Sequence, residues 1–172
     1  MKYTWIIGLM LLISCKDATE KEKVAEVKQT EGTEVILEIF DFDGLQKFLR
    51  TTDDKTYVVN FWATWCAPCI KELPYFEKLN KEYSDNVEVI LVSLDFPSKY
   101  ETKLKPYIKN KNLQSKVIAL NDVDSNSWIP KVDESWTGAI PATVIFNKDK
   151  RKFYEKSFNY DELETEVKRF LK

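Results

Sequence analysis

The sequence predicts an α/β fold in which a mixed β-sheet is flanked by helices. Two apolar, β-rich runs, 57–62 and 87–94, are each followed by a segment with helical periodicity, an alternation that favours parallel strands. Near the end of the chain, two strand-like runs surround the short polar turn 148–150, which favours antiparallel pairing. The chain has 172 residues, a length suited to one core and some extra segments.

The expected elements follow one another without an internal repeat. We expect strands at 35–40, 57–62, 87–94, 117–120, 142–147 and 152–158, and helices at 44–51, 66–83, 100–112 and 163–171. Pro74 lies inside the second of these helices and should kink it. The segment 124–135, which holds Trp128 and Pro130, is expected to be irregular.

The composition excludes several classes of chemistry. The formal net charge is −2, so there is no large basic field of the kind that binds nucleic acid. The chain contains no histidine, which removes Ser–His and Cys–His catalysis and the commonest zinc and haem ligand. Any catalysis must therefore depend on cysteine, carboxylate, lysine or tyrosine side chains.

The N-terminal segment has the pattern of a targeting sequence. Lys2 precedes the apolar run 5–13, which is much shorter than the ~20 residues that a membrane-spanning helix needs. The run ends in Leu-Ile-Ser-Cys at Cys15, which resembles the lipobox of bacterial lipoproteins. We therefore expect a signal peptide at 1–14 and a lipidated, flexible tether at 15–34, because that stretch is charged and poor in large apolar residues. An ordinary signal peptide or a signal anchor is the alternative.

Cys66 and Cys69 form a Cys-x-x-Cys pair between a predicted buried strand and a predicted helix. A helix N-terminus favours a thiolate, so the pKa of Cys66 is expected to fall, while Cys69 lies about one turn later and deeper. Pro68 limits the freedom of the loop at a position where a missing N–H costs little. A zinc site would need a second pair of ligands, and a purely structural disulfide would close too short a loop to stabilise the chain much.

The run 59–69, Val-Asn-Phe-Trp-Ala-Thr-Trp-Cys-Ala-Pro-Cys, resembles the active-site strand and turn of the thioredoxin superfamily. Pro74 falls where that family kinks its active-site helix, and Ile140-Pro141 precedes the second hairpin as the family's cis-proline does. The resemblance covers about 35–172 and implies a thioredoxin-like domain there. It also implies that the Ile140–Pro141 loop faces the cysteines and offers backbone hydrogen bonds to an incoming chain.

Further positions resemble the TlpA/ResA-like branch of extracytoplasmic reductases. Asn60 stands where cytoplasmic thioredoxin has a buried aspartate, and Glu72 matches a glutamate that the branch uses near the thiols. The stretch 100–136 resembles the central insertion of the branch, and the strand 35–40 fits its extra N-terminal hairpin. If Glu72 is buried, its pKa should rise and it could exchange protons with Cys69.

The two tryptophans of this motif are expected to differ in role. Trp65 should flank the Cys66 thiol and contact partners, whereas Trp62 should mainly pack in the core.

The resemblance implies a thiol–disulfide oxidoreductase of the protein-disulfide reductase type, with no cofactor and no metal. It would be lipid-anchored to a bacterial membrane through Cys15 and face the periplasm. Expected partners are disulfide-containing exported proteins, among them apocytochrome c before haem attachment, and a membrane protein that donates electrons. No nucleic acid is expected to bind.

Three alternatives remain open at the level of sequence. Cys-Ala-Pro-Cys does not decide between a reductase and an oxidant or isomerase, because the potential depends on how strongly the thiolate is stabilised. A thiol peroxidase of the same fold would use a Thr-x-x-Cys pattern, and Thr64 lies too close to Cys66 to supply it. A non-enzymatic binding lipoprotein is the third, although the intact cysteine pair and Pro141 argue against it.

Overall fold

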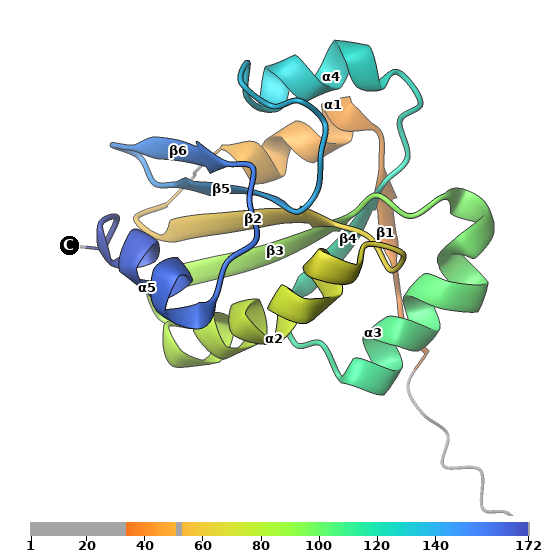
Figure 1. The fold of residues 1–172 in the computed structure, drawn as a ribbon, viewed down its shortest axis with the longest axis horizontal. Coiled ribbons are helices and arrows are strands. Elements are labelled where there is room, and N and C mark those ends of the chain that lie inside the picture. Colours follow the sequence, from red (N-terminus) through yellow and green to blue (C-terminus); the bar gives the residue numbers. More distant parts are fainter. Residues whose placement is uncertain (1–33, 51–52, 172) are drawn as a thin grey trace, which may run out of the picture. The chain divides into compact units, whose positions relative to one another are not determined.

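The computed structural model describes residues 34–50 and 53–171, shown as coloured ribbon in Figure 1. The predicted signal peptide, the lipidation of Cys15 and nearly all of the tether 15–34 lie outside these residues. The predicted domain 35–172 lies almost entirely within them.

The described residues form a six-stranded sheet in the order β1-β4-β3-β2-β5-β6. The strands are β1 (Glu38–Phe40), β2 (Thr56–Trp62), β3 (Val87–Ser93), β4 (Lys116–Leu120), β5 (Ala142–Phe146) and β6 (Arg151–Tyr154). Strands β1, β4, β3 and β2 run parallel to one another, whereas β5 is antiparallel to β2 and β6 is antiparallel to β5. The predicted mixed sheet is confirmed.

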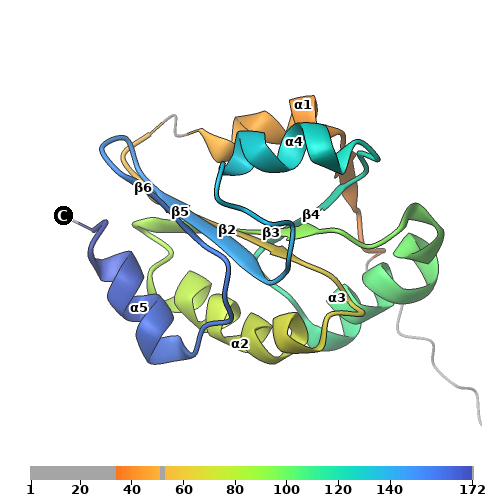
Figure 2. The ribbon, with the colours of Figure 1, turned by 45° about the horizontal axis from the view of Figure 1, so that its top comes forward.

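Helices cover both faces of this sheet. They are α1 (Phe42–Leu45), α2 (Ala67–Glu82), α3 (Lys105–Lys111), α4 (Ser125–Val132) and α5 (Tyr160–Lys168), with 3₁₀ turns at Gln46–Leu49 and Pro97–Lys99 and a π-helical turn at Tyr100–Leu104. Figure 2 shows α1 and α4 on one side of the sheet and α2, α3 and α5 on the other. Within the described residues, no helix is long and apolar enough to cross a membrane.

The two central strands β2 and β3 supply both apolar layers. Along β2, Val58 belongs to the core under α2, α3 and α5, whereas Val59 belongs to the core under α1 and α4. Along β3, Leu91 belongs to the core under α2, α3 and α5, and Val92 belongs to the core under α1 and α4. Successive side chains of a strand point to opposite faces, so strands buried on both faces need continuous apolar runs.

We expected an N-terminal hairpin, and the described residues do not form one. β1 has three residues and pairs in parallel with β4, with Glu38 opposite Ile118. A tight hairpin joins only antiparallel strands, so β1 is an edge strand added from a distant part of the chain. β4, expected as a short extra strand, lies inside the sheet between β1 and β3.

The segment 124–135 was expected to be irregular, and this expectation is wrong. Its centre forms helix α4, in which Trp128 and Val132 lie four residues apart and are both buried. The ring of Trp128 stacks on that of Phe42 at a centroid distance of 6.1 Å. Burial of this face outweighs the cost of Pro130 inside so short a helix.

Several other expected elements have shifted bounds, three of them as follows. The helix expected at 44–51 begins at Phe42, because the Asp41 side chain caps it by accepting a hydrogen bond from the Gly44 N–H at 2.8 Å. The helix expected at 100–112 starts as a π-helical turn before α3. The strand expected at 152–158 ends at Tyr154, so that 155–158 leave the sheet.

Candidate redox site

A disulfide joins Cys66 and Cys69 at the start of α2, with an S–S distance of 2.00 Å. Cys66 caps the helix, and its Sγ accepts a hydrogen bond from the Cys69 N–H at 3.3 Å. Pro68 lies in the first turn of α2, where its missing N–H removes no helical bond. Cys66 is 6% exposed and Cys69 is fully buried, so Cys66 is the sulfur nearer to an incoming molecule.

The loop that leads to Cys66 is held by a buried carboxylate. Thr64 donates to Asp95 through its backbone N–H at 2.9 Å and through its hydroxyl at 2.5 Å. The hydroxyl of Ser93 also donates to Asp95 at 2.9 Å, and Asp95 is only 2% exposed. Sequence analysis missed Asp95. The available signal was its place after a buried strand, because the carboxyl ends of parallel strands meet at one edge of the sheet.

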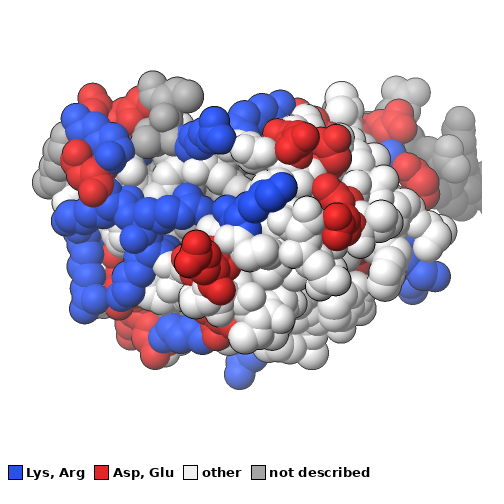
Figure 3. All heavy atoms as spheres, turned by 90° about the horizontal axis from the view of Figure 1, so that it is seen from above, with Lys and Arg blue, Asp and Glu red and all other residues white. Residues whose placement is uncertain are grey.

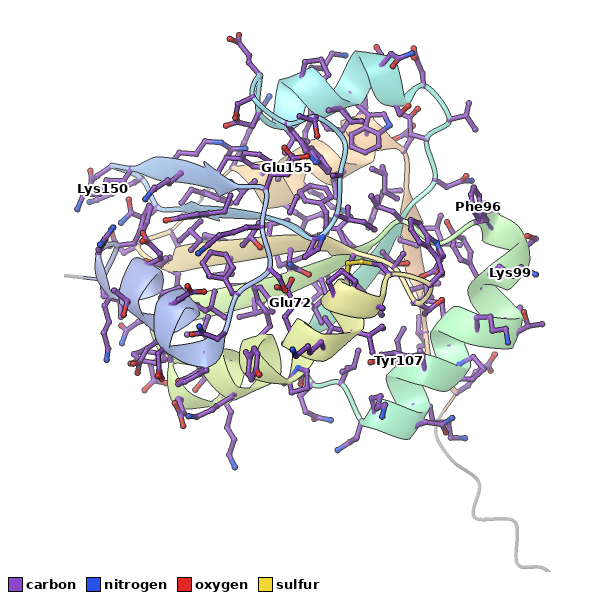
Figure 4. All side chains as sticks on the ribbon, in the orientation of Figure 1. Glu72, Phe96, Lys99, Tyr107, Lys150 and Glu155 are labelled. Carbon is purple, nitrogen blue, oxygen red and sulfur yellow. A yellow bond between two sulfur atoms is a disulfide. The ribbon has the colours of Figure 1, made fainter. Side chains whose placement is uncertain are left out.

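The aromatic side chains around this loop differ in exposure. Trp65 is 60% exposed beside Cys66, and Phe96, which follows Asp95, is 65% exposed and labelled in Figure 4. Trp62 is fully buried and packs against the ring of Tyr107 at a centroid distance of 5.6 Å. These positions agree with the expected division between a surface aromatic residue and a core one.

The loop before β5 faces the disulfide. The Ile140–Pro141 peptide bond is cis, as the resemblance implied. The carbonyl oxygen of Ile140 lies 3.7 Å from Cys66 Sγ. In the disulfide neither sulfur carries a proton, so this is a contact. In the dithiol form the Cys66 S–H could donate to the same oxygen.

Glu72 is fully buried on α2, three residues after Cys69 and therefore on the same side of the helix. Its carboxylate accepts hydrogen bonds from Asn60 Nδ2 at 3.0 Å, from the Ser157 hydroxyl at 3.0 Å and from the Phe158 N–H at 2.7 Å. Burial raises the pKa of Glu72, and these three hydrogen bonds oppose the rise only in part.

Asn60 connects Glu72 to the strand next to β2. Its Nδ2 donates both to Glu72 and to the Thr143 hydroxyl on β5, at 3.1 Å. Its Oδ1 is buried without a hydrogen-bond partner. The fold thus brings most of the predicted site residues to one region of the molecule: Asn60, Cys66, Cys69, Glu72, Ile140 and Pro141. Cys15 lies outside the described residues.

The part of the chain that the structure describes holds no group of three or more Cys, Asp or Glu side chains arranged to bind a metal ion.

Comparison with known proteins gives both sequence relatives and similar solved structures. The chain is 28% identical over 110 residues to the thioredoxin-like protein YneN of Bacillus subtilis, covering 60% of this chain and 64% of that one. It is 30% identical over 112 residues to the thiol-disulfide oxidoreductase ResA of Bacillus cereus, covering 64% of this chain and 60% of that one. The chain therefore spans less than two thirds of either relative.

Among solved structures, StoA from Bacillus subtilis is 25% identical, with a TM-score of 0.52, and the match covers 66% of this chain and 83% of StoA. The thioredoxin-like fold predicted from the sequence is confirmed by a thioredoxin-related protein from Neisseria meningitidis serogroup B, which is 24% identical with a TM-score of 0.59 over 70% of this chain and 87% of that one. Residues 19–151, which include both cysteines and the cis-proline, match the sequence profile of one family, and on that match the chain belongs to the AhpC/TSA family.

Proposed function

We propose that this chain is a thiol–disulfide oxidoreductase that reduces disulfides in exported proteins. The observation that carries the proposal is the position of the Cys66–Cys69 disulfide at a helix N-terminus, opposite the carbonyl of Ile140 and the cis-proline. A helix N-terminus stabilises a thiolate, and the less buried sulfur belongs to Cys66. The ResA relative, which is named a thiol-disulfide oxidoreductase, supports the same assignment.

The proposed cycle is dithiol exchange. The Cys66 thiolate attacks one sulfur of a partner disulfide, a mixed disulfide forms, and the other partner sulfur leaves as a thiolate that takes up a proton. Cys69 then loses its proton and attacks Cys66, which releases the second partner thiol. The partner gains two electrons from the Cys66–Cys69 pair, which becomes the disulfide. Cys66 starts as a thiolate and Cys69 gives up one proton, so solvent supplies the protons that the two partner thiolates take up.

In this cycle Glu72 would accept the proton that Cys69 must lose and return it when the pair is reduced again. A general base works best when its pKa lies near the working pH, and burial moves the pKa of Glu72 in that direction. Asn60 would orient the carboxylate through its Nδ2 hydrogen bond. Trp65 and the Ile140–Pro141 loop would contact the partner, with Trp65 supplying exposed aromatic surface next to Cys66.

The proposed location is outside the cytoplasm, with the domain held to a bacterial membrane by a lipid on Cys15 and facing the periplasm. The lipobox-like sequence at 12–15 and the charged stretch 16–34 support this placement. Two acyl chains would anchor the protein stably, whereas one would not. Cytoplasmic reductants do not reach this compartment, so a membrane protein would supply electrons. Exported proteins with cysteines, including apocytochrome c, would be the substrates.

The first test is the reduction potential of the full chain carrying Cys15→Ser, so that only one cysteine pair reacts. The protein is equilibrated with redox buffers and the dithiol fraction is measured. A potential near or below about −250 mV supports the reductase, whereas a potential above about −180 mV replaces it by an oxidant or isomerase.

The second test separates enzyme classes in the same background. Cys66→Ser should abolish reduction of insulin disulfides, and Cys69→Ser should leave Cys66 trapped in a mixed disulfide with the substrate. Consumption of hydrogen peroxide much faster than reduction of insulin would instead favour a thiol peroxidase. Retention of full function in cells by Cys66→Ser would favour a binding lipoprotein.

A further inference from the structure

The backbone segment before the cis-proline is held by a carboxylate from another part of the chain. Glu155 directly follows β6, and Figure 4 shows it beside this segment. Its carboxylate accepts hydrogen bonds from the Thr137 N–H at 3.2 Å, from the Ala139 N–H at 2.9 Å and from the Thr137 hydroxyl. Three donors from two residues of the loop, Thr137 and Ala139, therefore converge on one side chain.

A second side chain holds the same segment from the other side of the peptide. The carbonyl oxygen of Ala139 accepts a hydrogen bond from Trp136 Nε1 at 2.8 Å. The indole of Trp136 is itself buried against Phe61, at a centroid distance of 4.8 Å. Both backbone polar groups of Ala139 are thus bound by side chains, one fixed in the core and the other a carboxylate.

The position of Ala139 decides where the next residue lies. Ile140 follows it directly, and its carbonyl oxygen lies 3.7 Å from Cys66 Sγ. Gly138, in the middle of the held segment, has a φ of +93°, a conformation that residues with a Cβ rarely adopt. The loop therefore has an unusual backbone path that side-chain hydrogen bonds maintain, and Glu155 accepts most of them.

We propose that Glu155 is a positioning residue for thiol–disulfide exchange, which holds the Ile140–Pro141 loop beside Cys66 in the position from which its backbone binds a protein segment. This inference rests on the proposed function and names a residue that acts on the partner-binding side of the same site. A small disulfide reaches Cys66 without using the loop, whereas a protein disulfide needs the backbone of the loop for docking.

The test compares a protein disulfide with a small one, using the full chain with Cys15→Ser. Glu155→Gln keeps the shape of the side chain but replaces one acceptor oxygen by an NH₂ group and removes the charge. We expect the apparent KM for insulin to rise about five- to tenfold, the effect of one or two lost hydrogen bonds. The rate constant with 5,5′-dithiobis(2-nitrobenzoate) should change by about twofold or less, because that reagent needs only the Cys66 thiolate.

Two further variants keep the inference open to refutation. Thr137→Val removes only the hydroxyl donor and should raise the KM for insulin by a smaller factor, whether or not Glu155→Gln folds. Glu88→Gln, an exposed carboxylate on β3 that pairs with Lys55 at 3.6 Å, is the matched control and should behave as the parent. Equal slowing with both substrates, or no change with either, overturns the inference. If the parent itself fails to reduce insulin, the proposed function is what fails.

Discussion

At the scale of single residues, the proposed proton transfer depends on one buried carboxyl group and its donors. Glu72 accepts from Asn60, Ser157 and Phe158, yet burial still raises its pKa. Beside it, Asn60 Oδ1 lacks a partner. After rotation of the amide, this oxygen could accept a hydrogen bond from the O–H of a neutral Glu72, so the surroundings provide for both charge states.

Glu72→Gln tests this coupling between charge and stability. In the unfolded chain Glu72 has its ordinary pKa of 4.5, and the folded protein raises that pKa and so holds the proton more tightly. The resulting stability is fully present below that pKa and is lost as the pH rises through the folded pKa. Between the unfolded and the folded pKa of Glu72, the free energy of unfolding should fall by up to about 1.4 kcal/mol for each unit by which the pH rises.

The measurement is urea unfolding of the parent and of Glu72→Gln at a series of pH values. We expect the difference between them to shift steadily in favour of the Gln variant as the pH rises. Parallel curves for the parent and Glu72→Gln would show that the pKa of Glu72 is the same in both states.

At the scale of elements, the short connection between β6 and α5 acts on both sides of the redox pair. Glu155 holds the segment before the cis-proline, and two residues later Ser157 and Phe158 donate to Glu72. The other end of β6 ties helices to the sheet. Arg151 donates to the Leu49 carbonyl at 3.1 Å and to the Val132 carbonyl at 3.0 Å, at the ends of two helical segments.

Arg151→Met should therefore loosen the face of the sheet that α1 and α4 cover. Figure 3 views the molecule from above and shows blue Lys and Arg side chains gathered toward the left, with red acidic groups among them. Arg50, Lys131 and Arg151 line a cleft. We expect a loss of about 1–2 kcal/mol in the free energy of unfolding, after discounting for exposure.

Urea unfolding measures this loss, and Arg50→Met is the control, because Arg50 donates within its own helical segment, to Gln46. The reduction potential of Arg151→Met should match that of the parent, because its contacts lie on the far side of the sheet from α2. A changed potential with unchanged stability would contradict this division of roles.

At the scale of the whole molecule, redox state and folding stability are linked. A reductase forms its own disulfide readily because the folded protein favours the disulfide over the dithiol. We therefore expect the oxidised protein to unfold at a higher urea concentration than the reduced protein. Each 30 mV by which the folded protein lowers the potential of the pair corresponds to about 1.4 kcal/mol of this difference.

Unfolding curves of the two forms, recorded under oxidising conditions and with excess dithiothreitol, provide the measurement. Cys66→Ser, which cannot form the disulfide, should unfold at the same urea concentration with and without dithiothreitol. A reduced form more stable than the oxidised form would mark the protein as an oxidant.

The sequence predicted those features that local residue patterns encode. The Cys66–Cys69 pair, the proline at 141 and the central strands follow from short motifs and apolar runs. Helix α4 was misread because Pro130 is a local signal, whereas the burial of Trp128 against α1 is a tertiary one. The parallel pairing of β1 with β4 likewise depends on residues far apart in the chain.

Two carboxylates that shape the site could not be found in the same way. Asp95 and Glu155 are two of 28 acidic residues; the place of Asp95 after a buried strand was its one local signal, and nothing in the immediate neighbours of Glu155 separates it from a solvated residue. Their importance comes from donors that are 31 and 16 residues away in the chain. Only the folded chain brings these groups within hydrogen-bonding distance.

The wide spacing of the site along the chain has a consequence for biogenesis. Cys66 leaves the ribosome 74 residues before Ile140, and Glu72 leaves 86 residues before Phe158. A nascent chain therefore presents both thiols before the loop that faces them and the backbone donor that binds Glu72 have been synthesised. Until then the pair lacks the contacts that the folded chain gives it, so its final surroundings are complete only after the β6–α5 connection has been synthesised.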